Sequence, residues 1–398
     1  MMTKNNNPTK RRKFNVLYFG PRGLQGGIGG SARLVNMLGV LARLKANTYL
    51  ISYLPESRFK VIKKQINSSL DTTTICVPAS SAKIFKAIAL LQIFIQGLRQ
   101  ARKSAIIFSH SPSIVYGLPA LILARIFGRP LLIDLTDSKD NNTPGFIYKG
   151  VLRNANIVFA VSRYLTESAR AAGCRNVIHA PGFISAETFR HNPSERKRIR
   201  KELNIAGDEV VIGYSGAFSP DEGLSYLVKA FERLTGHHRN IRLVLLGGRN
   251  VTGSDDIPQL INKLGIKERV IVIPPQPYEM VPAYLSTFDI ACSPKVDREL
   301  NRAADPIRVY EYMSVGLPVV ASRVGETANA IEDGSDGFLV KPEDENDLAR
   351  VLDYVIQNLG SLQPLREKAR EKVINNYTQE VIMKKLQTQL KKLTTIEI

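Results

Sequence analysis

The chain has 398 residues, of which 44% are hydrophobic and 23% are charged. This length exceeds the size at which one hydrophobic core stops growing, and the composition is that of a globular protein, so disordered and fibrous classes are excluded. The net charge of +19 is uneven, because residues 1–190 hold 27 Lys and Arg against 7 Asp and Glu, whereas residues 191–398 hold 28 against 29. We therefore expect two folded domains, of which the first is strongly basic.

The cysteines and the first residues indicate a reducing compartment. Cys76, Cys174 and Cys292 lie far apart without metal-binding spacing, which argues against a disulfide framework and against a zinc site. Residues 1–13 are polar and basic and lack the apolar stretch of a signal peptide, so we expect a disordered basic tail. The predicted location is the cytoplasm.

Short β-branched strands alternate with helical patterns along both halves. In the first half the predicted strands are FNVLYFG, NTYLISYL, AIIFSH, PLLIDLTD and NIVFAVS. In the second half they are VVIGYSGAF, RLVLLGG, RVIVIP, IACSPK and PVVASR. This alternation is typical of βαβ units, so each half is predicted to be a doubly wound parallel sheet of the α/β class.

The pattern also predicts the domain boundaries. We expect the first domain at residues 14–190 and the second at residues 209–375, joined by a charged linker at 191–208 whose middle forms a short helix. Residues 376–398 have apolar residues at helical spacing and a basic opposite face, which predicts a packed amphipathic helix. Doubly wound sheets bind ligands beyond the carboxyl ends of their strands, so the site is expected in a cleft between the domains.

Residues 82–103 combine an apolar helical face with basic residues near both ends. Two interpretations stay open. Such a helix lies in a membrane interface and attracts anionic lipid, or it is a core helix with a solvated basic end. The longest apolar stretches, 84–98 and 112–128, are too short or too interrupted to span a bilayer. Under the first interpretation the protein is located at the inner face of the membrane, with an anionic membrane surface as a partner of its basic first domain.

The second half resembles a known family of enzymes. The run RVYEYMSVGLPVVAS (308–322), followed by VGETANAIEDGSDGFLVKPEDENDLARVL, looks like the donor-binding domain of the retaining family-4, or group 1, glycosyltransferases. In the first half, GGIGGSARLVNMLGVLARL and NANIVFAVSRYLTE are similar to the glycine-rich first loop and the domain-closing strand and helix of that family. The resemblance implies the GT-B fold, in which two Rossmann-like domains face a central cleft.

The resemblance also implies a reaction. A sugar moves from a nucleoside-diphosphate donor to a carbohydrate or lipid-linked acceptor with retention of configuration, and the nucleotide sugar is a substrate, so no cofactor and no metal are expected. The acceptor hydroxyl attacks on the face that the diphosphate leaves, and a phosphate oxygen takes its proton, so no protein nucleophile is needed.

Glu311 is the central donor-binding candidate that the resemblance implies. It stands where the family has the second of two glutamates, eight positions apart, that binds the ribose hydroxyls. A carboxylate accepts two charge-assisted hydrogen bonds from a vicinal diol. Gly316 and Pro318 are predicted to end its helix and return the chain to the sheet. The other donor-binding candidates are Gly27, Gly29, Ser215, Gly216 and Arg308.

Three residues are catalytic candidates. His110 ends the strand AIIFSH and is expected to face the cleft, where it bonds a sugar hydroxyl or caps the following turn. Asp137 follows Thr136, which stands where the family often has a histidine near the donor sugar. Asp305 lies two residues after Ala303, which replaces the first of the two glutamates, and we expect Asp305 to take over its role.

The sequence departs from the family at the diphosphate. Ala217 and Glu222 stand in YSGAFSPDEG where the family has an arginine and a lysine. Each lost charge-assisted contact is worth about 1.5 to 3 kcal/mol, and Glu222 is expected to repel the leaving group. These departures leave open a non-catalytic GT-B protein that binds sugar. The basic first half leaves open a nucleic-acid-binding protein, but basic motifs with interleaved aromatic residues are absent from the sequence, so no nucleic-acid partner is expected.

Overall fold

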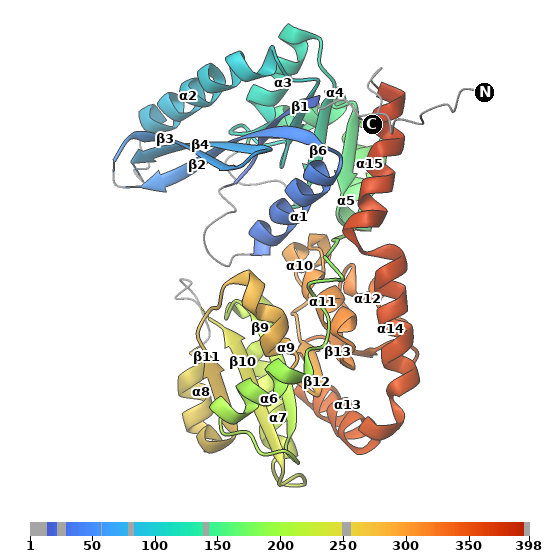
Figure 1. The fold of residues 1–398 in the computed structure, drawn as a ribbon. Coiled ribbons are helices and arrows are strands. Elements are labelled where there is room, and N and C mark those ends of the chain that lie inside the picture. Colours follow the sequence, from blue (N-terminus) through green and yellow to red (C-terminus); the bar gives the residue numbers. More distant parts are fainter. Residues whose placement is uncertain are drawn as a thin grey trace, which may run out of the picture.

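A computed structural model of the protein describes residues 14–21, 29–56, 58–78, 83–137, 143–248 and 256–393. These residues form two α/β domains, one above the other in Figure 1, and each domain has one sheet with helices on both faces. The predicted tail at residues 1–13 lies outside the described residues.

The first sheet has the strand order β3-β4-β2-β1-β5-β6-β7-β8. Its strands are β1 (Phe14–Phe19), β2 (Ala46–Glu56), β3 (Lys60–Asn67), β4 (Leu70–Pro78), β5 (Ile106–Ser109), β6 (Leu131–Leu135), β7 (Ile157–Ala160) and β8 (Val177–His179). The expectation of a purely parallel sheet is wrong at one edge, because β3 runs antiparallel to β4. The side chains of β3 are mostly exposed and include Lys63 and Lys64. Charged residues on an edge strand hinder pairing with other chains, and they also hide the apolar alternation that predicts a strand.

Two helical layers cover this sheet. One layer holds α2 (Lys83–Ala101), α3 (Gly117–Phe127), α4 (Gly145–Asn154) and α5 (Arg163–Ala171), whose buried residues share a core with the sheet. The other layer holds α1 (Gly29–Arg43) and α15 (Gln379–Leu393). Among the described residues, none of the helices combines the length and the apolar character needed to span a membrane.

The second sheet is parallel, with the order β11-β10-β9-β12-β13-β14. Its strands are β9 (Val210–Gly216), β10 (Ile241–Gly247), β11 (Val270–Ile273), β12 (Ile290–Ser293), β13 (Val319–Ser322) and β14 (Phe338–Val340). Five of them match predicted strands, and β14 is additional.

The helices of the second domain also lie in two layers. One face is covered by α7 (Leu224–Leu234), α8 (Ile257–Lys263) and α13 (Glu345–Asn358). The other is covered by α9 (Val281–Leu285), α11 (Ile307–Val315) and α14 (Gln363–Asn376). The remaining helices are α6 (Pro193–Glu202), η1 (Pro220–Glu222), η2 (Lys267–Arg269), η3 (Tyr278–Met280), α10 (Glu299–Ala303), α12 (Thr327–Ala330) and η4 (Leu359–Ser361).

Local sequence signals explain where key helices begin and end. The side chain of Asn192 accepts a hydrogen bond from the backbone N–H of Glu195, and Pro193 occupies the first turn, so α6 begins within the predicted linker. Gly316 has φ of 85°, which a glycine adopts without strain, so α11 ends there and the chain turns into β13.

The chain crosses between the domains twice, at adjacent places. Ile184 lies on the first crossing and forms a parallel bridge with Thr378 on the second. After the second crossing, α15 packs against α1 through Ile382, Leu386 and Leu390, which are buried (Figure 1). The last helix therefore belongs to the core of the first domain.

Candidate functional site

Three charged side chains meet at the carboxyl edge of the second sheet. Arg308 lies in the first turn of α11, Lys295 follows β12, and Glu222 ends η1 after β9. Nη1 of Arg308 donates to Oε2 of Glu222 at 2.7 Å, and Nζ of Lys295 lies 3.8 Å from Oε1. All three side chains are largely buried. Because parallel strands end at one edge, residues far apart in sequence form one cluster there.

The two cations outnumber the carboxylate, and this sets the charge of the cluster. Burial by itself raises the pKa of Glu222, but Arg308 and Lys295 outweigh it and lower that pKa to about 2. Glu222 is therefore ionised and is paired with two cations, and the expectation that it repels the leaving group stays a prediction. It is the counter-ion of the pair, and the cluster keeps one net positive charge. Lys295 was missed at the sequence level, although a lysine directly after a buried strand is a detectable signal.

Gly216 allows Arg308 to lie against the end of β9. A Cβ atom at position 216 would meet Nη2 of Arg308 at 2.1 Å, and φ is 152°, so any other residue would displace the guanidinium and strain the backbone. The guanidinium also stacks 4.6 Å above the ring of Tyr214. The backbone N–H of Ser215 donates to the hydroxyl of Tyr312 at 2.8 Å. The predicted residues Ser215, Gly216 and Arg308 thus lie together.

Glu311 lies one turn after Arg308, so both side chains project from neighbouring positions of α11. Its Oε1 accepts a hydrogen bond from the hydroxyl of Tyr278 at 2.9 Å. Burial raises the pKa of Glu311 to about 7, although Tyr278 and Arg308 oppose the shift. Burial makes the charged form of this carboxyl group unfavourable. Hydrogen bonds from a diol would stabilise the charged form, so a bound ribose would lower the pKa of Glu311 again.

The first domain contributes a second polar cluster, at the ends of its own strands. Arg33 of α1 and Asp134 of β6 form a bidentate pair, with Nη2 to Oδ1 at 2.6 Å and Nε within 3.0 Å of both oxygens. Both side chains are almost fully buried. The single acidic residue within the apolar strand LLIDL was a signal for this pair, since buried carboxylates are rarely unpaired.

Asp305 brings the second domain to this cluster. Its Oδ2 lies 3.7 Å from Nη1 of Arg33, across the domain interface. The side chain lies directly beside Gly182, where an added Cβ would meet Oδ2 at 2.2 Å. Burial raises the pKa of Asp305 to about 7, while Arg33 and the backbone of Gly182 oppose the rise.

His110 and Asp137 are placed differently from each other. His110 follows β5 and is buried, with Nε2 at 3.3 Å from the hydroxyl of Thr136 and Nδ1 at 3.8 Å from Oδ2 of Asp134. Burial lowers the pKa of His110, against the effect of Asp134. Asp137 is exposed and accepts a hydrogen bond from Thr136 at 2.9 Å. The structure therefore brings His110 and Asp305 to one cluster and leaves Asp137 at its rim.

Polar atoms at the domain interface are buried with few partners. Among the described residues, no hydrogen-bond partner is found for Nη1 of Arg33, Nδ1 of His110, both carboxyl oxygens of Asp305, and the hydroxyls of Tyr18 and Tyr310. Buried polar groups are nearly always satisfied by protein, water or ligand, so this concentration is typical of a place where a polar ligand binds.

Three other predicted positions have different outcomes. Gly27 lies outside the described residues, and Gly29 is the first residue of α1. Ala303 is buried and packs with the core of the first domain, and its carbonyl accepts from the hydroxyl of Ser162 at 2.8 Å. The backbone of Ala303 therefore links the two domains, and its methyl side chain cannot bond a sugar hydroxyl.

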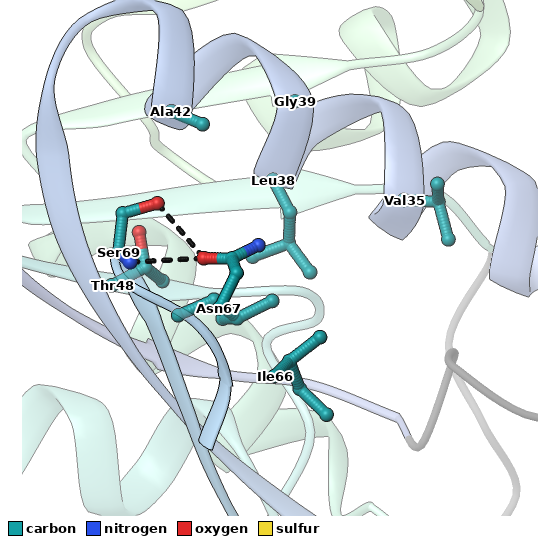
Figure 2. Close-up of a pocket in the computed structure, with 9 residues that line it drawn as sticks. Val35, Leu38, Gly39, Ala42, Thr48, Ile66, Asn67 and Ser69 are labelled. Atoms are coloured by element: carbon teal, nitrogen blue, oxygen red, sulfur yellow. Dashed lines mark hydrogen bonds between the residues drawn. The ribbon is translucent and has the colours of Figure 1, made fainter.

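Two cavities lie outside these clusters. The first, of about 210 Å³, lies between α1 and the β3–β4 hairpin and is lined mainly by apolar side chains (Figure 2). It includes Thr48 and Leu70, near the amino ends of β2 and β4, so it is remote from the strand ends that carry the polar groups. The second, of about 450 Å³, lies between α5 and the second domain and is lined by charged residues including Arg163, Glu167, Arg302 and Glu326.

Comparison with known proteins shows that the second domain is similar to a family of glycosyltransferases. Residues 195–375 match the family model described as "Glycosyl transferases group 1". The chain is 29% identical over 213 residues to D-inositol 3-phosphate glycosyltransferase of Nocardia farcinica, covering 52% of this chain and 46% of that protein. It is 24% identical over 266 residues to alpha-D-kanosaminyltransferase of Streptomyces kanamyceticus, covering 63% and 66%. The first match thus spans less than half the length of the relative.

Solved structures show the fold of the whole chain. Sucrose-phosphate synthase from Thermosynechococcus elongatus has a TM-score of 0.75 at 19% identity, covering 96% of this chain and 99% of that one. HepE of Anabaena, in complex with UDP and glucose, has a TM-score of 0.73 at 19% identity, covering 96% and 100%. These structural matches show the GT-B fold for the whole chain, and the family match to group 1 glycosyltransferases covers residues 195–375.

Proposed function

We propose that the protein transfers a sugar from a nucleoside-diphosphate donor to a hydroxyl of a carbohydrate or lipid-linked acceptor, with retention of configuration, as a family-4 enzyme. The observation that carries the proposal is the position of Arg308 and Lys295 beside Glu311, at the carboxyl edge of the sheet in the segment that matches the family model. Positive charge for a diphosphate and a carboxyl for a ribose are the two contacts that such a donor requires.

The proposed reaction exchanges one glycosidic bond for another. The bond from the anomeric carbon to the diphosphate oxygen breaks, the acceptor oxygen bonds to that carbon on the same face, and the acceptor proton passes to a phosphate oxygen. Arg308 and Lys295 compensate the charge that develops on the diphosphate. Asp305 and His110, on the other side of the site, are the candidates for hydrogen bonds to sugar hydroxyls.

UDP-glucose is the first donor to test, because the structural neighbour HepE is described in complex with UDP and with UDP-glucose. Calorimetric titrations of UDP, GDP and ADP and their sugar conjugates into the wild type should show binding of one base and one sugar. Glu311→Ala should abolish that binding, whereas Glu371→Ala, an exposed change on α14, should not. Proton NMR of the product then gives the anomeric configuration.

The non-catalytic alternative makes the opposite prediction. This alternative rests on Ala217 and Ala303, which lack the polar side chains that the family has there. Glu222 no longer supports it, because Arg308 and Lys295 place positive charge beside that carboxylate. Binding of free sugar without binding of any nucleotide sugar would support it and overturn the proposed transfer.

A further inference from the structure

The outer surface of α2, α3 and α4 carries a concentration of exposed apolar side chains. Seven of the sixteen exposed large hydrophobic side chains in the described part lie on these three helices. Four of them, Ile88, Leu91, Ile95 and Leu98, follow one line along α2, and Leu91 is 57% exposed. The spacing of three and four residues places them on one side of the helix.

The neighbouring helices continue this surface. Ile122 and Ile126 of α3 are exposed, and Phe146 of α4 is 77% exposed. α2 contacts α3 and α3 contacts α4, in one layer on one face of the first sheet. Figure 1 shows α2 and α3 along the top of the molecule, away from the second domain. We name these exposed side chains of α2, α3 and α4 the helical face.

The charges on the helical face have one sign. The chain has no acidic residue between Asp71 and Asp134, and none within α4. Exposed cations lie mostly in the last turn of each helix or directly after it: Arg99, Arg102, Lys103, Arg125, Lys149 and Arg153. In the described part of the chain none of these six is in an ion pair, whereas several exposed cations of the second domain are paired, such as Arg350 with Asp347.

We propose that the helical face docks onto a bilayer surface that contains anionic lipid. Apolar side chains interleaved with unpaired cations suit the boundary between acyl chains and anionic headgroups, since the former are buried and the latter meet phosphate. Exposed apolar patches of this kind normally mark an interaction site. A second copy of the chain is a different occupant, and the experiment separates the two outcomes.

The position of α2 relates the helical face to the candidate site. α2 follows β4, so it begins at the carboxyl edge of the first sheet, the edge that carries Arg33, His110 and Asp134. The apolar line on α2 therefore runs from near the edge that carries the polar cluster toward the amino edge of the sheet, where Arg99, Arg102 and Lys103 lie. Docking itself does not depend on the transfer reaction, and nucleotide binding is measured separately on every variant.

The test is flotation of the full chain with phosphatidylcholine vesicles, with and without phosphatidylglycerol, at low and high salt. The wild type should float only with the anionic vesicles and should sediment at high salt. The triple change Leu91→Gln, Ile95→Gln and Phe146→Gln should reduce the bound fraction about tenfold or more. The matched pair Val272→Gln and Ile374→Gln, at exposed apolar positions of the second domain, should leave it unchanged.

Charge is tested in the same way. Arg99→Gln with Arg102→Gln should lower partitioning about 30-fold, from about 1 kcal/mol per cation at the surface. Lys391→Gln with Lys392→Gln removes the same charge from α15 and should have a much smaller effect. Thermal unfolding and nucleotide binding of each variant should match the wild type.

Three outcomes would overturn the proposal. The wild type could stay at the bottom with anionic vesicles, or the triple variant could float as well as the wild type. Sedimentation velocity could also show a wild-type dimer that the triple change dissociates, which would assign the helical face to a second copy.

Discussion

Arg308 and Glu222 form a buried ion pair at the carboxyl edge of the second sheet, with 2.7 Å between Nη1 and Oε2. Glu222 stands where the resembled family has a cation, and Arg308 and Lys295 approach it from two other elements. Positions 217 and 222 hold no cation, and positive charge at this edge comes from Arg308 at the start of α11 and Lys295 after β12. The following predictions test this arrangement.

Glu222→Gln should destabilise the protein by about 3 to 5 kcal/mol, because two buried cations lose their counter-ion. The same change should strengthen UDP binding about tenfold, because the diphosphate no longer competes with a carboxylate for Arg308. Thermal unfolding with and without UDP measures both effects. Asp297→Asn, which breaks an exposed pair with Arg302, should change stability by less than about 1 kcal/mol. Weaker UDP binding by Glu222→Gln would show that the carboxylate orients the cations for the donor.

Glu311→Gln should stabilise the protein while it weakens donor binding. The pKa of Glu311 is 4.5 ordinarily and about 7 in the fold, so the folded state binds more protons than the unfolded state between these values. Stability is therefore lost as pH rises from 4.5 to 7, by about 3 kcal/mol at 1.36 kcal/mol per pKa unit. Glutamine removes this cost and can still accept from Tyr278.

The measurement is the free energy of unfolding of both proteins at pH 4.5 and pH 8. The variant should be more stable at pH 8 and nearly equal at pH 4.5, and its affinity for the nucleotide should fall about 10- to 100-fold. Equal stability at both pH values would contradict the raised pKa, whereas unchanged affinity would remove Glu311 from the donor site.

Arg33→Ala should cost about 3 to 5 kcal/mol, because Asp134 would remain buried without a partner. Arg43→Ala is the matched control on the same helix, since Arg43 pairs with Glu380 at the surface and should cost about 1 kcal/mol or less. Urea unfolding compares the two variants. Similar losses would mean that the Arg33–Asp134 pair is not a buried anchor of the first domain.

Gly216→Ala should displace Arg308 and weaken UDP binding at least tenfold, because the new methyl group would overlap the guanidinium. Gly207→Ala places a methyl group where no atom lies within 4 Å and should leave binding unchanged. Calorimetry with UDP gives both affinities, and circular dichroism verifies the fold. Normal affinity in Gly216→Ala would place the diphosphate away from Arg308.

Strand and helix patterns predicted the α/β class and ten of the fourteen strands in the described residues, because buried strands and amphipathic helices carry their own periodicity. The missed strands had weaker signals. β3 is charged and exposed, β8 and β14 have three residues each, and β4 carries three threonines. The reversal of β3 is likewise decided by its pairing with β4, which is non-local.

The candidate site was predictable where a motif is local. Arg308, Glu311 and Gly316 stand within one helix and its end, so their spacing sets their geometry. Lys295 follows β12 and Glu222 lies in η1, and no local sequence pattern predicts that they lie close to Arg308. The Arg33–Asp134 pair spans 101 positions, and Asp305 joins it from the other domain.

The sequence by itself determined the two-domain α/β organisation, the basic character of the first domain and the placement of Glu311 after Arg308. These features follow from composition, from the periodicity of single strands and helices, and from short motifs, and none of them requires knowing which distant segments pack together. Only the tertiary structure decided that ionised Glu222 is paired with Arg308, that Asp305 lies near Arg33, and that α15 returns to the first domain. Parallel strands bring distant chain segments to one edge, and electrostatic balance there depends on which segments meet.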